Sequence, residues 1–221
     1  PLTDVVLECR EVSGAKDIPV KTLPCRVEKI ERVAEDVIVL SLKLPVNERL
    51  QFLAGQYIEF LLKDGKTRAF SIANAPHSEG LLELHIRQVA GGEFTSHIFN
   101  HMKVKEILRL RGPLGTFFLR EPSAKPIIFV AGGTGFAPVK SIIEHALHSG
   151  IRQPMTLYWG ARNRAGLYLH DLATRWASEH DNIRYVPVLS EPAAADQWAG
   201  RTGLVHQAVL EDQPTLDSFQ V

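Results

Sequence analysis

The amino-acid sequence predicts two domains, an antiparallel Greek-key β-barrel followed by an α/β domain with a doubly wound parallel sheet. Two patterns predict this fold class: short alternating strands fill the first half, and continuous apolar strands alternate with helices in the second. The chain has 221 residues, 45% of them hydrophobic, which is enough for two modest cores.

Residues 1–22 contain few aromatic side chains and two turn-like pairs, so we expect a linker there. The barrel is expected over residues 23–122. Its predicted strands alternate between apolar and polar residues and are separated by turns such as Asp64-Gly65. They lie at residues 25–32, 36–44, 56–62, 67–71, 82–87 and 107–111, with one short helix near residues 93–101.

The second domain is expected over residues 123–221. Pro126–Ala131 is continuously apolar, as expected for a strand buried on both faces. Strands are predicted at residues 126–131, 155–159 and 183–189, and helices at residues 138–148, 169–178 and 202–210. Strand–helix alternation of this kind indicates a parallel sheet. Phe219–Val221 resembles the start of another strand, so we expect the domain to be incomplete at its C-terminal end.

The composition excludes several classes of protein. The formal net charge is zero, which argues against a general nucleic-acid-binding protein. No apolar run is long enough to span a bilayer, and the N-terminus lacks a signal-peptide pattern. Cys9 and Cys25 form no metal-binding spacing and are expected to be reduced thiols of a cytoplasmic protein. The scattered histidines predict no metal site.

The first candidate site is the glycine turn Ala131–Pro138, AGGTGFAP. It lies where a buried strand passes into a helix, so backbone amides there can approach a pyrophosphate and the helix N-terminus favours negative charge. Gly133, Thr134, Gly135 and Pro138 are its candidate binding residues. The alternative is a tight turn that uses glycine only for its backbone freedom.

The second candidate is Gly91–Ser96, GGEFTS, at the start of the short helix. Two glycines and two hydroxyl groups at a helix start can hold a phosphate. The alternative is an ordinary helix cap in which Thr95 or Ser96 satisfies the free amides.

The third candidate is Arg68-Ala69-Phe70-Ser71 at the end of a strand. Arginine is well suited to phosphate, and the aromatic ring of Phe70 lies on the same strand face and can stack on a flat ring. The alternative is an edge strand with a solvated arginine. The three candidates together suggest two nucleotides that meet at a cleft between the domains.

These motifs, together with Gly112–Phe117 (GPLGTF), resemble the ferredoxin–NADP reductase family from about Leu23 to Val221. Within it, the chain resembles the bacterial oxygenase reductases and the CDP-6-deoxy-3,4-glucoseen reductases. The resemblance implies that residues 1–22 are a remnant of an N-terminal ferredoxin-like domain. A [2Fe–2S] cluster is then expected only in a longer parent chain, because its cysteine set is absent here.

The resemblance also implies roles for individual residues. Arg68 would hold a flavin phosphate, Phe70 would stack on the isoalloxazine ring in place of the family's more frequent tyrosine, and Ser71 would be the catalytic residue near flavin N5. The other implied flavin-binding residues are Ala69, His85, Ile86, Arg87, Gly91, Gly92, Phe94, Thr95 and Ser96. For His85 and Arg87 a structural role is equally open. Trp159, Gly160 and Arg162 would hold the adenosine half of the nicotinamide nucleotide.

The resemblance therefore predicts an NAD(P)H-dependent flavoprotein reductase that uses FAD, or alternatively FMN, and passes electrons to a [2Fe–2S] centre or a partner protein. One alternative is a stand-alone reductase that uses flavin as a diffusible substrate. Another is a non-catalytic flavin- or nucleotide-binding electron-transfer subunit, because segments that complete the family's nicotinamide site would lie beyond Val221. The choice between NADH and NADPH and the final acceptor, an oxygenase, a dehydratase or free flavin, stay open.

Overall fold

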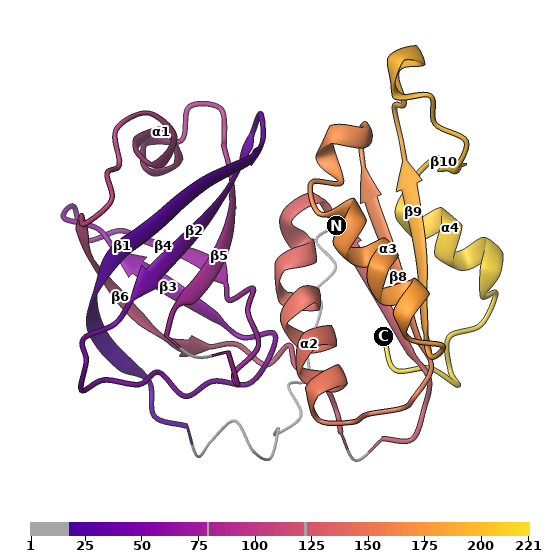
Figure 1. Ribbon diagram of the computed structural model, residues 1–221, viewed down its shortest axis with the longest axis horizontal. Coiled ribbons are helices and arrows are strands. Elements are labelled where there is room, and N and C mark those ends of the chain that lie inside the picture. Colours follow the sequence, from indigo (N-terminus) through magenta and orange to yellow (C-terminus); the bar gives the residue numbers. More distant parts are fainter. Residues whose placement is uncertain (1–17, 79, 122) are drawn as a thin grey trace, which may run out of the picture.

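The computed structural model describes residues 18–78, 80–121 and 123–221. It confirms the predicted fold class, because an antiparallel sheet in the first half is followed by a parallel sheet with helices in the second. The two domains lie side by side, with helix α2 (Phe136–His148) between their sheets (Figure 1).

The barrel contains six strands in the order β4-β3-β6-β1-β2-β5. The main-chain bridge between Ile72 and Leu84 joins its two outer strands and so closes the sheet. The 8-residue helix α1 (Glu93–Asn100) lies between β5 and β6. The strands are β1 (Lys21–Ala34), β2 (Val37–Lys43), β3 (Tyr57–Leu61), β4 (Thr67–Ser71), β5 (Leu82–Arg87) and β6 (Ile107–Leu114).

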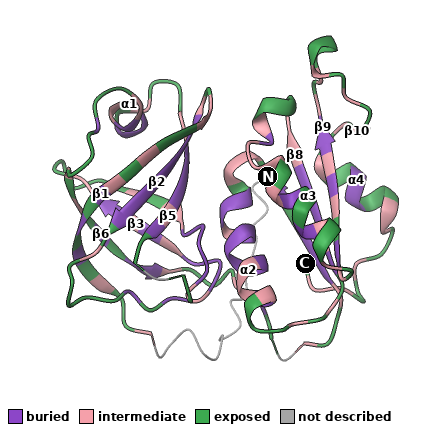
Figure 2. Ribbon diagram, viewed as in Figure 1, coloured by how far each residue is buried: buried purple, intermediate pink, exposed green. Residues whose placement is uncertain are grey.

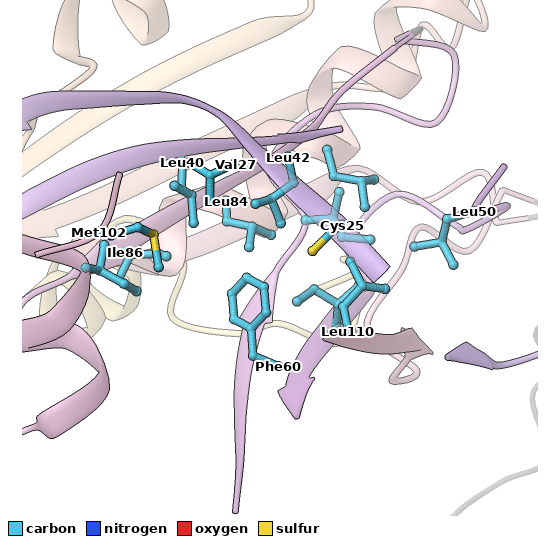
Figure 3. Packing of buried hydrophobic residues seen from close by; sticks show 14 of the residues in the cluster. Cys25, Val27, Leu40, Leu42, Leu50, Phe60, Leu84, Ile86, Met102 and Leu110 are labelled. Atoms are coloured by element: carbon cyan, nitrogen blue, oxygen red, sulfur yellow. The ribbon is translucent and has the colours of Figure 1, made fainter. Parts of the chain in front are cut away.

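Buried and exposed residues alternate along β1 and show which face of the strand lies on the barrel core. Leu23, Cys25 and Val27 are buried and their neighbours on the strand are more exposed, as expected for a strand with one face on the core. Figure 3 shows Cys25 and Val27 packed with Leu40, Phe60 and others, and Leu23 belongs to the same cluster. The strand begins at Lys21, which pairs with Gly112. The last two residues of the expected linker therefore belong to the barrel sheet, whereas residues 1–17 lie outside the described residues.

The second sheet is parallel and has the order β10-β9-β8-β7. Helices α2 and α3 pack on one of its faces and α4 on the other, so it is covered on both sides. Its elements are β7 (Ile127–Gly132), β8 (Met155–Ala161), β9 (Ile183–Leu189), β10 (Arg201–Thr202), α3 (His170–Glu179) and α4 (Val205–Asp212), with 3₁₀ turns at Gly133–Gly135, Arg164–Gly166 and Ala194–Asp196.

Two helix starts differ from the sequence prediction. Helix α2 begins at Phe136, so Pro138 lies within its first turn, where a missing N–H is tolerated. The helix predicted from residue 202 is wrong at its start, because Arg201 and Thr202 pair with Val188 and Leu189 as β10. Gly203, with a φ of +111°, then turns the chain before α4 begins at Val205.

Strand β7 has a partner on each side. β8 pairs with it along one edge, and Gln220 forms a parallel bridge with Ile127 along the other. The chain therefore crosses to the opposite edge of β7 after α4, which places the carboxyl end of β7 at a topological switch point. Such points are the usual ligand sites of open α/β sheets.

At the domain interface, α2 and the region of α3 in the second domain contact the barrel segments around Ala73 and Glu83. Ser141 donates a hydrogen bond of 2.8 Å to the Asn74 carbonyl, and Lys140 Nζ lies 3.3 Å from the Ala73 carbonyl oxygen. Helix α2 is thus buried along much of its length, as Figure 2 shows. None of the helices among the described residues is long and apolar enough to cross a bilayer.

Candidate functional site

A pocket of about 600 Å³ opens between the two domains and is called here the interdomain pocket. Strands β4 and β5, the start of α1 and the glycine turn after β7 all contribute to its wall. It therefore brings together residues from all three sequence candidates. The lining residues are Arg68, Ala69, Phe70, Ser71, His85, Arg87, Val89, Gly92, Phe94, Thr95, Thr134, Gly135 and Ala137.

Strand β4 supplies one wall of the interdomain pocket. Arg68 is half-buried, and its Nη1 donates to the carbonyl of Thr67 at 2.8 Å. The half-buried Phe70 ring lies 5.8 Å from the ring of Phe60 and 6.1 Å from that of Phe94. These tilted contacts fix one side of the Phe70 ring on the barrel core, while the residue still lines the pocket.

The donor groups of Arg87 indicate whether an anionic group fits the interdomain pocket. Its Nε and Nη2 atoms are buried and make no hydrogen bond within the described residues. Nε is 3.3 Å from Asp36 Oδ2, close enough for an ion pair but without hydrogen-bond geometry. Buried guanidinium donors without acceptors are costly, and a phosphate would satisfy them. The phosphate groups of a flavin cofactor therefore fit the donors present.

The glycine turn after β7 lies directly against Arg87. Gly133 has a φ of +52°, and a Cβ atom there would be 3.1 Å from the Arg87 guanidinium carbon. The carbonyl of Gly133 accepts a 2.9 Å hydrogen bond from Trp159 Nε1. The left-handed backbone conformation therefore favours glycine, and a side chain here would also require the Arg87 guanidinium to shift by a few tenths of an ångström.

The start of α1 is formed by Gly92, which has no side-chain cap. The Thr95 hydroxyl instead accepts from the Val89 amide at 3.1 Å, so it fixes the loop before the helix. A Cβ atom at Gly92 would lie 2.7 Å from that hydroxyl. The alternative of a cap by Thr95 or Ser96 is therefore wrong, and the helix start lies open beside the pocket.

Several expected site residues lie outside the pocket lining. Trp159 and Ile86 are fully buried, and Trp159 stacks on Phe136 with ring centroids 3.9 Å apart. Gly160 faces Val205, where a Cβ atom would be 2.8 Å away, and Arg162 is exposed at the end of β8. Gly91, Ser96, Gly133 and Pro138 also lie outside the lining. Their roles stay predictions.

A partly buried polar cluster at the domain interface was not predicted from the sequence. It contains Glu83, His85, Lys140, Glu144 and Tyr168, joined by contacts of 2.9–3.1 Å. Glu83–His85 and Lys140–Glu144 are close in sequence, but the contacts from His85 to Tyr168 and from Glu83 to Lys140 join residues of different domains, and local patterns give no sign of those. His85 was a candidate, but its partners were not.

No cluster of histidine, cysteine or acidic residues suitable for a metal ion occurs among the described residues. Cys25 is a buried free cysteine, and burial raises the pKa of its thiol to about 12. Cys25 is therefore a core residue rather than a ligand or nucleophile.

Comparison with known families gives two matches along the chain. Residues 24–119 match the oxidoreductase FAD-binding domain, and residues 129–221 match the oxidoreductase NAD-binding domain. The gap between the two matches, residues 120–128, covers the end of the loop between β6 and β7 and the first two residues of β7. The interdomain pocket thus contains residues from both matched regions.

Individual relatives agree with these matches. The chain is 46% identical over 219 residues to the CDP-6-deoxy-L-threo-D-glycero-4-hexulose-3-dehydrase reductase of Yersinia pseudotuberculosis, covering 99% of this chain and 65% of that protein. It is 34% identical over 207 residues to an NAD(P)H-flavin reductase of Vibrio harveyi, covering 90% and 85%. The chain spans 54–65% of the length of the first curated relatives it matches.

A solved structure shows the same arrangement of domains. The cytochrome P450 reductase GcoB of Amycolatopsis superposes with a TM-score of 0.83 at 34% sequence identity. The superposition covers 91% of this chain and 61% of that one.

Proposed function

The chain belongs to the ferredoxin reductase-like family of FAD- and NAD-binding oxidoreductases, and on this premise we propose that it passes electrons from NAD(P)H through bound FAD to a partner. FAD, when bound, would supply the chemistry, namely acceptance of hydride at its N5 atom and release of single electrons. The residues of this chain would bind and orient the two nucleotides.

The interdomain pocket is the observation that carries this proposal. Gly92 at the start of α1 and Thr134-Gly135 after β7 line the pocket together with Arg87, whose buried Nε and Nη2 atoms make no hydrogen bond within the described residues. Backbone amides at helix starts and guanidinium groups both favour phosphate. A site with two phosphate-binding turns from two domains suits two nucleotides better than one.

Each pocket residue has a proposed role. Arg68 and Arg87 would hold flavin phosphate groups, and the start of α1 at Gly92 would supply backbone amides. Phe70, fixed on its far side by Phe60, would lie against the flat ring system. Ser71 would orient the reacting nitrogen by a hydrogen bond. None of these side chains has to act as a strong acid or base.

The proposal is tested with the purified protein. We expect yellow protein, or colourless protein that becomes yellow with FAD, and loss of flavin absorbance when NADH is added without oxygen. Arg68→Ala should weaken flavin retention, Phe70→Tyr should keep it, and Ser71→Ala should mainly slow reduction. Arg109→Ala, an exposed arginine on β6, is the matched control. Protein that binds neither FAD nor FMN would overturn the proposal.

The proposed electron acceptor is an iron–sulfur centre, either in a longer parent chain or in a partner such as a dehydratase or an oxygenase. The support is in the relatives, which include a dehydrase reductase and a terephthalate 1,2-dioxygenase reductase component. No nucleic-acid or membrane partner is proposed, and a cytoplasmic location, where NAD(P)H is supplied, fits this role.

A stand-alone flavin reductase is the second candidate, because the chain covers 85% of the NAD(P)H-flavin reductase of Vibrio harveyi. In that case flavin would be a diffusible substrate. Gel filtration of the reconstituted protein separates the candidates, since a bound cofactor elutes with the protein and a substrate does not.

NADH is the proposed nicotinamide nucleotide. Arg162 and Arg164, which follow β8, are the two arginines that could meet a 2′-phosphate, and Arg164 Nη1 already donates to the carbonyl of Asp196 in the Ala194–Asp196 turn at 3.4 Å. Only the exposed Arg162 is then left for that role. The ratio of kcat/KM for NADH and NADPH, measured with Arg162→Ala beside the unchanged protein, tests this preference.

A further inference from the structure

His85 lines the interdomain pocket from β5, and both of its ring nitrogens have partners. Nδ1 lies 2.9 Å from the Tyr168 hydroxyl oxygen, and Nε2 lies 2.9 Å from Glu83 Oε1. The residue is only 5% exposed, so these partners fix its ring orientation. The Tyr168 contact crosses the domain interface, because Tyr168 follows the Arg164–Gly166 turn of the second domain.

The protonation states in this chain of contacts can be assigned. Burial alone would raise the pKa of Glu83, but the hydrogen bond from His85 and the charge of Lys140 outweigh it and lower the pKa to about 2. Glu83 is therefore a carboxylate and accepts from His85 Nε2–H. Burial lowers the pKa of His85 and raises that of Tyr168. The neutral imidazole then accepts a hydrogen bond from the Tyr168 hydroxyl at Nδ1.

Aromatic packing aims the Tyr168 hydroxyl at His85. The Tyr168 ring stands edge-on to the rings of His85 and Trp159, at centroid distances of 5.4 and 5.3 Å. Phe136 stacks on Trp159 and also faces Tyr168 edge-on, at 6.3 Å. The tyrosine ring is thus held by the second domain while its hydroxyl reaches a residue of the barrel.

Lys140 connects Glu83, the second partner of His85, to the second domain. From α2 of the second domain, its ammonium group lies 3.1 Å from Glu83 Oε1 and 3.0 Å from Glu144 Oε1. Glu83 in turn accepts from His85. Both hydrogen-bond partners of His85 therefore depend on the second domain, Tyr168 directly and Glu83 through Lys140.

We propose that Tyr168 is a positioning residue of the interdomain pocket, which holds the neutral His85 ring in one tautomer and one orientation from across the domain interface. The wall of the pocket that His85 forms is then complete only when the two domains are docked. The inference rests on the proposed function in one respect, namely that this pocket is the flavin site.

The test compares two tyrosine-to-phenylalanine variants, because the chain contains a second tyrosine–histidine pair. Tyr185 lies with its hydroxyl oxygen 3.1 Å from His170 Nδ1, wholly within the second domain. Both Tyr168→Phe and Tyr185→Phe keep the ring and remove one hydroxyl donor to a histidine Nδ1. ¹⁵N NMR of histidine-labelled protein, titrated with acid, follows each imidazole directly and needs no flavin.

In Tyr168→Phe we expect the His85 Nδ1 resonance to move and the pKa of His85 to rise, because the lost hydrogen bond favoured the neutral ring. In Tyr185→Phe only the His170 signals should move. Glu83→Gln provides a second variant with the opposite sign, since loss of the carboxylate should lower the pKa of His85. Unchanged His85 signals in Tyr168→Phe would overturn the inference.

Steady-state assays then connect this positioning to the pocket. Tyr168→Phe should lower kcat about tenfold, the order expected for one buried hydrogen bond, with KM for NADH nearly unchanged. A failure of the proposed function is distinguishable, because protein that binds no flavin would still show the NMR changes. Protein that is reduced normally by NADH while Tyr168→Phe leaves kcat unchanged would contradict the positioning role alone.

Discussion

The barrel core and the domain interface are held together by different chemistry. The core consists of apolar side chains such as Leu40, Phe60 and Leu110, all almost fully buried. The interface instead buries Lys140 and Ser141, which bind carbonyl and carboxylate groups of the barrel. Apolar packing is non-directional, so a core tolerates small shifts, whereas a buried charge needs its partner at a fixed place.

The barrel core and the domain interface therefore contribute differently to the stability of the fold and to the specificity of domain docking. Burial of apolar area supplies most of the folding free energy. A buried ion pair contributes little net stability, but removal of one partner leaves an uncompensated charge. The interface therefore specifies how the domains dock more than it stabilises them.

The largest effect is expected in the core. Phe60, which is 1% exposed, contacts the rings of Phe70 and Phe94. Phe60→Ala should lower the free energy of unfolding by about 3–5 kcal/mol, because it removes buried area and leaves a cavity. Urea unfolding measures this, with Val46→Ala at a fully exposed position as the control. A loss below about 1 kcal/mol would mean that the core collapses around the gap.

The next effect is expected at the interface. Lys140→Met should cost about 3 kcal/mol, because the Glu83 and Glu144 carboxylates lose their shared cation. Thermal unfolding measures the loss. The double variant Lys140→Met with Glu83→Gln should recover part of the lost stability, since it leaves one carboxylate without its cation instead of two. If the double variant were as unstable as the sum of the single ones, packing rather than charge would hold the interface.

Acid should weaken the interface before it affects the core. The folded pKa of Glu83 is about 2 and its usual value is 4.5, so the unfolded chain binds more protons and stability falls as pH drops through this range. His85, whose pKa burial lowers, acts in the same direction below its usual value of 6.5. Glu144, whose pKa burial raises, opposes them.

Between pH 5 and pH 2, the loss of stability from Glu83 should be about 3 kcal/mol. The midpoint of thermal unfolding against pH, compared for the unchanged protein and Glu83→Gln, measures it. The variant should show the shallower decline, and parallel curves would rule out Glu83 as the source.

The smallest effect concerns Cys25 in the barrel core. Burial raises the pKa of this thiol to about 12, so it should not react with a thiol reagent at pH 8 while the barrel is folded. A Cys9→Ser background leaves Cys25 as the single thiol. We expect Cys25 to be labelled only at the rate at which the protein unfolds. Fast labelling of the native protein would contradict a closed barrel core.

The strands were predictable because their information is local. Alternation in Lys21–Ala34 and the continuous apolar run of Ile127–Gly132 each follow from which faces of the strand are buried. The error at residue 202 has a physical reason too. Two residues are too few to show a strand pattern, and Arg201–Thr202 form β10 only because β9 lies beside them.

The candidate site was predictable in part. Arg68, Gly92 and Gly135 belong to motifs whose chemistry is visible in sequence, and they line the same pocket. Of the partners of His85, Glu83 lies two residues away on the same strand, whereas Tyr168 was not predictable, because it lies 83 residues away and meets His85 only through docking of the domains. Lys140, 67 residues from Ala73, is hidden for the same reason within an ordinary amphipathic helix.

Gly55 sets a condition for exchanging domains between related reductases. Its φ is +103°, and a Cβ atom there would be 2.4 Å from the Phe117 carbonyl oxygen and 2.9 Å from Ile142 Cδ1. A hybrid protein that joins this barrel to another nucleotide domain must therefore keep glycine at position 55 and a side chain no bulkier than isoleucine at position 142. Exchange of domains between such enzymes is therefore limited by the packing around Gly55 as well as by the charged groups of the domain interface.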